Sequence, residues 1–414
     1  MKNVPRPYTL VAELTHRCPL SCLHCSNPRA LVPKWREIST DDWLRVLDEA
    51  EALGVVQVHF SGGEPLLRLD LEALVARARA LSLYVNLVTS GIPLERARLE
   101  KLVRAGLDHV QLSVQSAHIL RGDRIAGKTG AHATKRKVLG WLRDLGVPFT
   151  LNVVLHRENL GEIDAIVALA ERYGADRLEL ANTQYAGYAR ENLHALLPDA
   201  AALDAARERA AFHRTRLAGA MKIIFVKPDY FGDRPKACMD GWARSFVVLA
   251  PDGTVLPCHS ASSIEGLEFW RIDAGSLPEI WARSPGLQAF RGEGWMKDPC
   301  RSCPDKEKDR GGCRCQAWML AGDPAAADPV AVALHGHQRP RAAHEAGELR
   351  RLAARRGAGI QHAHAGLDTG PAQAILRQRH ARRRNELVVA RCDCVPGFAG
   401  LFQFLRNHGV LLQE

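Results

Sequence analysis

The chain has 414 residues, of which 46% are hydrophobic and 25% are charged. These ordinary globular values exclude a wholly disordered, collagen-like or coiled-coil chain. No stretch approaches the ~18 consecutive apolar residues of a membrane span, and residues 1–10 lack the apolar core of a signal peptide. We therefore expect a cytoplasmic protein without a membrane partner.

Strand and helix patterns alternate through the first half of the chain. Apolar, β-branched runs predict strands at residues 9–15, 55–60, 84–89, 109–114, 150–155 and 177–180. Amphipathic runs predict helices at residues 40–53, 70–81, 94–105, 133–145, 162–173 and 199–217, the first of them capped by residues 39–42. This alternation indicates an α/β fold with a parallel sheet, open or barrel-like, whose chemistry lies in the loops after the strands.

The pattern changes at about residue 221. A strand is predicted at residues 222–226, and a hairpin at 245–256 turns at Pro251, Asp252 and Gly253. The region is otherwise rich in glycine, proline and loops and holds six cysteines, and because loops bury little apolar surface, bound metal would supply stability. We predict one domain over residues 1–220 and a second over residues 221–330.

Residues 331–414 form a third, atypical segment. They hold thirteen Arg, no Lys and six acidic residues, so most of the formal net charge of +10 lies there. We predict a poorly ordered basic tail, and its composition is typical of GC-rich DNA read in a wrong frame. The charge invites a metal-containing nucleic-acid binder as an alternative function, but its place in the tail makes a nucleic-acid partner unexpected.

Three cysteines, Cys18, Cys22 and Cys25, follow the first predicted strand. Three thiolates within eight residues can hold three irons of a 4Fe–4S cluster and leave the fourth iron open. The alternative is a zinc site that recruits His16 or His24 as a further ligand.

This Cys triplet resembles that of the radical S-adenosylmethionine (SAM) enzymes. The resemblance implies a partial (β/α)6 barrel and a 4Fe–4S cluster whose open iron chelates the amino and carboxylate groups of SAM. It also implies reductive cleavage of SAM to methionine and a 5′-deoxyadenosyl radical, so that the cofactors carry the difficult chemistry.

Motifs at the ends of later predicted strands also match those of the family, in the same order after the Cys triplet. The second strand ends in Gly62, Gly63, Glu64 and Pro65, and the resemblance implies that Gly-Gly-Glu binds the SAM amino group. The alternative for this run is an ordinary turn. The resemblance further implies SAM-binding roles for later polar residues, for which a plain strand-end or surface position is the alternative. These are Ser113 and Gln115 at the ribose or methionine, Arg124 at the carboxylate, and Asn152.

The second cysteine block resembles the SPASM extension of peptide-modifying radical SAM enzymes. The resemblance implies one auxiliary iron–sulfur cluster on Cys238, Cys258, Cys313 and Cys315, and another on Cys300, Cys303 and Asp309. The chain departs from the pattern because Asp309 stands where a cysteine is usual and because residues 317–330 lack the last cysteine. A zinc ribbon formed by Cys300, Cys303, Cys313 and Cys315 is the alternative.

Four runs, at residues 14–20, 25–28, 123–127 and 311–317, resemble a peptide-cyclising branch of the family. This implies a precursor peptide, a small chaperone that presents it, a cellular one-electron donor, and a carbon–carbon link between a Glu and a Tyr of the peptide. Another SPASM reaction, such as thioether formation, is the alternative. Residues 184–188 depart from the branch at a place where substrate contact is expected.

Overall fold

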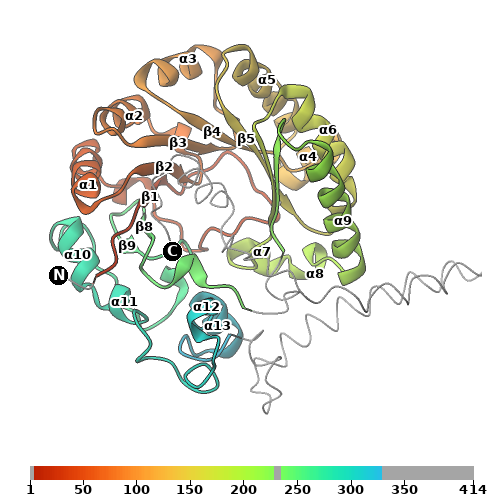
Figure 1. Cartoon of the computed structure of the whole chain (residues 1–414). Helices are drawn as coiled ribbons and strands as arrows, with labels where there is room; N and C mark the ends of the chain where they lie inside the picture. Colours follow the sequence, from red (N-terminus) through yellow and green to blue (C-terminus); the bar gives the residue numbers. More distant parts are fainter. Residues whose placement is uncertain (1–3, 228–234, 329–414) are drawn as a thin grey trace, which may run out of the picture.

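The structure is a computed structural model that describes residues 4–227 and 235–328 (Figure 1). The tail predicted at residues 331–414 lies outside the described residues.

A nine-stranded sheet forms the centre of the molecule, in the order β7-β6-β5-β4-β3-β2-β1-β8-β9. Neighbouring strands are parallel except β8 and β9, which are antiparallel. Its strands are β1 (Thr9–Thr15), β2 (Gln57–Gly62), β3 (Tyr84–Thr89), β4 (His109–Ser113), β5 (Phe149–Leu155), β6 (Arg177–Asn182), β7 (Lys222–Phe225), β8 (Phe246–Leu249) and β9 (Val255–Leu256).

Helices cover the outside of this curved sheet, while the second region consists mainly of loops with a few short helices (Figure 1). The helices of the first region are α1 (Thr40–Leu53), α2 (Leu71–Ala80), α3 (Arg96–Ala105), α4 (Ile119–Ala126), α5 (Ala131–Asp144), α6 (Ile163–Tyr173), α7 (Gly187–Glu191), α8 (Leu193–Leu196) and α9 (Ala200–Arg216). Those of the second are α10 (Leu277–Arg283), α11 (Pro285–Gln288), α12 (Lys306–Asp309) and α13 (Arg314–Ala321). Short 3-10 turns include η2 (Pro65–Leu67) and η5 (Cys238–Asp240).

The core lies between the sheet and the outer helices, as the apolar periodicity predicts. Trp43 of α1 and Phe60 of β2 are fully buried in it. Ser39 caps α1 through a reciprocal capping box with Asp42, which confirms the helix start read from the sequence. The six strand–helix units predicted for the first region are present, and the α/β partial-barrel prediction is confirmed.

The sheet continues across the boundary predicted at residue 220. β7 pairs with β6, while β8 pairs with β1 at the other side and forms the predicted hairpin with β9. The sequence reading missed α4, a helix of only eight residues that buries Gly122, Ile125 and Ala126 and leaves Leu120 85% exposed. No helix within the described ranges is long and apolar enough to cross a membrane.

Candidate active site

The Cys triplet (Cys18, Cys22 and Cys25) lies in the loop that leaves the C-terminal end of β1. The backbone N–H groups of Ser21 and Leu23 donate to the carbonyls of Ala126 and Ile125 at the end of α4, at 3.0 and 3.1 Å. On the other side, the N–H of Ala189 in α7 donates to the carbonyl of Cys25 at 2.9 Å. Elements far apart in sequence therefore hold this loop in place.

The three thiols lie close enough to influence one another. Burial, together with a smaller contribution from neighbouring thiolates, raises the pKa of Cys18 to about 11 and that of Cys22 to about 12. Burial also raises the pKa of Cys25. Such thiols keep their protons at neutral pH unless bound metal displaces those protons. This behaviour suits ligands of a metal cluster.

Three thiols in one loop suit a cluster that binds each thiolate on a different iron. In residues 4–227 and 235–328, no group of three or more His, Cys, Asp or Glu side chains is placed to hold one metal ion. Thiolates around one zinc ion would lie only ~4 Å apart, whereas an iron–sulfur cube binds each thiolate on a different iron. His16 also faces elsewhere, since its Nδ1 accepts from Val32 N–H at 3.0 Å.

Gly62 and Gly63 pack directly on the backbone of the triplet loop. A Cβ on Gly62 would lie 2.3 Å from the Thr15 carbonyl oxygen, and one on Gly63 would lie 2.5 Å from that of Arg17. Gly63 N–H and Glu64 N–H donate to these same two carbonyls at 2.6 and 2.8 Å. The glycines thus allow the end of β2 to lie against the Cys triplet, as their phase in the sequence predicts.

Glu64 is fully buried and accepts four hydrogen bonds. Its Oε1 accepts from Thr89 Oγ1 at 2.6 Å and from Leu66 N–H at 3.2 Å. Its Oε2 accepts from the N–H of Ser90 at 2.9 Å and from the Ser90 hydroxyl. Burial raises the pKa of Glu64, while these donors oppose the rise. All four acceptor positions are used, so a contact with the SAM amino group requires the Ser90 hydroxyl to turn away.

The structure brings Ser113 and Gln115, at the C-terminal end of β4, beside Asn152 in the middle of β5. Asn152 pairs in register with Ser113, and its carbonyl accepts from Val114 N–H at 2.9 Å. The side-chain Oδ1 of Asn152 is buried and accepts no hydrogen bond from the described part of the chain. These three predicted residues therefore lie near one another in the sheet.

Arg124 lies apart from this group. Its side chain is 60% exposed and forms an ion pair with Glu158. The arginine predicted to bind the SAM carboxylate is therefore largely exposed and already forms an ion pair with Glu158.

A buried cation that the sequence reading missed, Lys135 of α5, lies next to the strand ends instead. Lys135 is 1% exposed, and its Nζ donates to the Ser113 carbonyl at 2.8 Å and to Gln115 Oε1. Burial lowers the pKa of Lys135 to about 8, while Cys22, Glu64 and Cys18 oppose the fall. A lysine on the buried face of α5, one turn from Ala131 and Val138, was the available signal.

Two neutral histidines complete the surroundings of the triplet. The rings of His24 and His156 lie 5.3 Å apart, and burial lowers their pKa values to about 3 and about 4. His24 Nδ1 and His156 Nε2 are buried and have no hydrogen-bond partner in the described residues. They offer polar contacts to a bound molecule. α7 also approaches here, because a Cβ on Gly187 would lie 2.0 Å from the Asn27 carbonyl oxygen.

In the second region, the structure gathers Cys238, Cys258, Cys313 and Cys315 into a four-cysteine group. Cys258 Sγ lies 3.5 Å from Cys315 Sγ, and Cys313 forms hydrogen bonds with Cys238 and Cys315. Hydrogen bonds from Cys238 and Cys315 lower the pKa of Cys313, and those with Cys258 and Cys313 raise that of Cys315. The set predicted for the first auxiliary cluster is thus assembled from three separate segments.

The second predicted ligand set is Cys300, Cys303 and Asp309. In the sequence, residues 310–312 separate it from Cys313 and Cys315. Burial raises the pKa of Cys300, and the charges of Asp309, Asp328 and Cys303 raise it further against the effect of Arg314. Asp328 was not predicted; it is 1% exposed, and its Oδ2 accepts from Cys313 N–H at 3.0 Å. The structure pairs Cys313 and Cys315 with Cys238 and Cys258, which disfavours the zinc-ribbon arrangement.

Comparison with family models matches residues 12–170 to the radical SAM superfamily and residues 238–304 to the SPASM iron–sulfur cluster-binding domain. Among solved structures, Streptococcus suis SuiB bound to S-adenosylmethionine is similar, with a TM-score of 0.65 and 18% identity, covering 77% of this chain and 75% of that one. The structure of anSMEcpe with bound AdoMet and a peptide has a TM-score of 0.55 at 15% identity, covering 86% and 98%.

Fold, site and family models together define a radical SAM enzyme with a SPASM domain, which uses a 4Fe–4S cluster and SAM. Curated relatives are more specific. The PqqA peptide cyclase of Granulibacter bethesdensis is 46% identical over 337 residues, or 81% of this chain and 90% of the relative. That of Methylocella silvestris is 50% identical over 328 residues, 79% and 88% of the two chains. The chain belongs to this family of PqqA peptide cyclases.

Proposed function

We propose that this chain cyclises the precursor peptide PqqA in the biosynthesis of pyrroloquinoline quinone. The observation that carries the proposal is the identity of 46% and 50% to PqqA peptide cyclases over about nine-tenths of their length. We further propose a cytoplasmic enzyme that receives PqqA from the small chaperone PqqD and electrons from a cellular one-electron donor.

The proposed product is a carbon–carbon bond between a Glu γ-carbon and the carbon ortho to the Tyr hydroxyl. When bound, the cluster on the Cys triplet and SAM supply a 5′-deoxyadenosyl radical, and an auxiliary cluster supplies an acceptor for one electron. The Glu γ-carbon loses one hydrogen atom and attacks the Tyr ring. Loss of one electron and one proton from the ring then restores its aromaticity.

The chain's own residues bind and orient these groups. We propose the Cys triplet as ligands of the SAM-binding cluster, the four-cysteine group as ligands of the first auxiliary cluster, and Cys300, Cys303 and Asp309 as ligands of the second. Gly62, Gly63, Glu64 and Pro65 shape the site beside the triplet, with Glu64 at the SAM amino group.

Lys135 is the proposed partner of the SAM carboxylate. Its ammonium group is buried close to Cys18, Cys22 and Glu64, whereas Arg124 is largely exposed and already paired. A buried ammonium favours an anion beside it, because the low dielectric strengthens their attraction. Ser113, Gln115 and Asn152 remain proposed contacts for the ribose or methionine.

The test is anaerobic reconstitution with iron and sulfide, followed by incubation with PqqA, PqqD, SAM and a reductant. The expected result is a PqqA product lighter by two hydrogens, formed together with 5′-deoxyadenosine. Formation of 5′-deoxyadenosine without any change in PqqA would contradict the substrate assignment. A PqqA product with a different cross-link would instead favour another SPASM reaction.

A further inference from the structure

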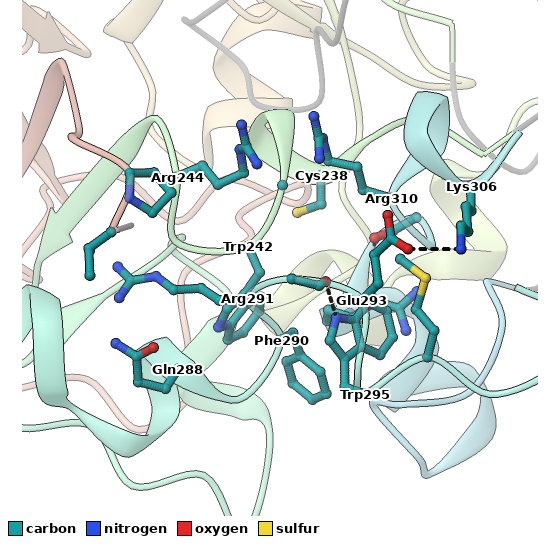
Figure 2. A pocket seen from close by; sticks show the side chains of 17 residues that line it. Cys238, Trp242, Arg244, Gln288, Phe290, Arg291, Glu293, Trp295, Lys306 and Arg310 are labelled. Atoms are coloured by element: carbon teal, nitrogen blue, oxygen red, sulfur yellow. Dashed lines mark hydrogen bonds and ion pairs between the residues drawn. The ribbon is translucent and has the colours of Figure 1, made fainter. Parts of the chain in front are cut away.

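A cavity of about 440 Å³ opens in the second region beside Cys238 (Figure 2). The loop after η5, the segment that follows α11, and residues 306–314 form its walls. The volume lies within the usual range for a small-molecule site.

The lining of this cavity is strongly basic. It contains Arg244, Arg291, Lys306, Arg310 and Arg314, while Glu293 is its one acidic side chain within the described residues. Glu293 is already paired with Lys306, whose Nζ lies 2.8 Å from the carboxylate. The four arginines have no carboxylate within ion-pair distance in the part of the chain that the structure describes. They therefore leave a net positive charge in a concave site.

Several of these guanidinium groups are buried with N–H donors unused. Arg314 is 1% exposed, and its Nη1 donates to the carbonyls of Pro324 and Ala326 at 2.9 and 2.8 Å, yet its Nη2 has no acceptor among residues 4–227 and 235–328. Arg291 and Arg244 are half-buried residues, but the atoms Arg291 Nη2 and Arg244 Nε are themselves buried and lack acceptors in these ranges. A buried donor without an acceptor costs free energy, so its persistence points to a ligand.

Arg244 and Arg310 lie side by side in the lining of the cavity, both against Gly241. A Cβ on Gly241 would lie 2.4 Å from Arg244 Cδ and 2.9 Å from Arg310 Cδ, so only glycine leaves room for both side chains. Gly241 has φ +115°, and its N–H donates to the Cys238 carbonyl at 2.7 Å. Figure 2 shows the two arginines near Cys238.

We propose that this cavity binds a small oxyanion, a phosphate or carboxylate group, against Arg244, Arg291, Arg310 and Arg314. Guanidinium groups match such groups in shape and charge, and their bonds to them are among the strongest that neutral-pH side chains form. An anion seated there lies beside Cys238 and would place negative charge next to the four-cysteine group. The proposal does not depend on the cyclisation of PqqA.

Charge balance for nearby thiolates is the competing explanation of these arginines. Arg314 does act this way, since its charge lowers the pKa of Cys313 and opposes the rise at Cys300. Arg291 does not: burial lowers its pKa to about 10, and no thiolate or carboxylate contributes to that change. Arg291 instead stacks on the ring of Trp281 at 4.6 Å, so at least one cation of the cavity has no anionic partner among the described residues.

The experiment measures binding of inorganic phosphate and of succinate to the full, reconstituted chain by titration calorimetry. A double variant, Arg244→Gln with Arg310→Gln, removes two cations whose side chains form no hydrogen bond or ion pair with the described residues. Arg283→Gln, at an exposed position of α10 outside the cavity, is the matched control. Iron content and thermal unfolding of each variant show whether it has folded and loaded.

Saturable binding of one of the two anions to the unmodified chain is expected, weaker by roughly tenfold or more in the double variant and unchanged in Arg283→Gln. Added salt should weaken it as well. Tighter binding of phosphate would identify a phosphate ester as the natural ligand class, and tighter binding of succinate a carboxylate. No saturable binding of either anion to the unmodified chain, or equal binding by a correctly loaded double variant, would overturn the proposal. If the double variant does not fold, anion binding to the unmodified chain by itself supports or overturns the proposal.

Discussion

Lys135→Met is the most informative single substitution in the first region, because Lys135 is the buried cation nearest the Cys triplet. Lowering a lysine pKa from 10.5 to about 8 corresponds to about 3 kcal/mol of lost stability at neutral pH. Removing the charge returns this free energy, but it leaves the Ser113 carbonyl and Gln115 Oε1 without a donor, at ~1–3 kcal/mol each. The two effects oppose each other, so the free energy of unfolding should change little.

SAM affinity should respond much more strongly than stability. If Lys135 pairs with the SAM carboxylate, its loss leaves a buried charge without a partner, which costs ~2–5 kcal/mol. This corresponds to SAM binding weakened by about 30-fold or more. Equilibrium binding of SAM to reconstituted protein is the assay, and Lys137→Met, on the exposed face of the same helix, is the control.

The pH dependence separates the two effects. The pKa of Lys135 is lower in the folded chain than in the unfolded chain, so between pH 8 and 10.5 the unfolded chain binds more protons. Its destabilising effect is therefore complete below pH 8 and disappears toward pH 10.5. The unfolding free energy of Lys135→Met relative to the unmodified chain should fall over that range. Unchanged SAM affinity in a folded Lys135→Met variant would refute the carboxylate assignment.

Three further predictions concern the thiol sites and Glu64. Gly63→Ala should lower thermal stability and iron loading at the Cys triplet, because its Cβ would lie 2.5 Å from a carbonyl oxygen, whereas Gly161→Ala, with open space around it, should do neither; iron counting and thermal unfolding measure both. Glu64→Gln should lower the unfolding free energy by ~2–4 kcal/mol, because the amide group accepts fewer hydrogen bonds than the carboxylate does; chemical denaturation checks this, and an unchanged midpoint would contradict it. Cys258→Ser and Cys300→Ser should each remove part of the iron, with additive losses if the two sets bind separate clusters, and equal iron in the single and double variants would argue for one shared cluster.

The sequence by itself determined the local chemistry of this protein. The Cys triplet lies within eight residues of one loop, so its spacing indicated a metal site, with an iron–sulfur cluster favoured over zinc. Gly62 and Gly63 follow the next strand, and parallel neighbouring strands end at the same edge of the sheet, so their meeting with the triplet was predictable. The strand–helix alternation predicted the parallel α/β sheet for a similar reason, because both periodicities are local properties of the chain.

The tertiary structure decided the contacts between distant segments. Cys258 meets Cys315 across 57 residues, and periodicity carries no information about such pairings. Lys135 looked like one of several lysines until burial placed it beside Ser113 and Gln115, and Arg124 looked suitable until its exposure and its pairing with Glu158 were visible. The basic cavity beside Cys238 likewise draws arginines from three separate segments. Charge and thiol chemistry can be read from residue types, but the neighbours that shift their pKa values and leave their donors unused come together only when the chain folds.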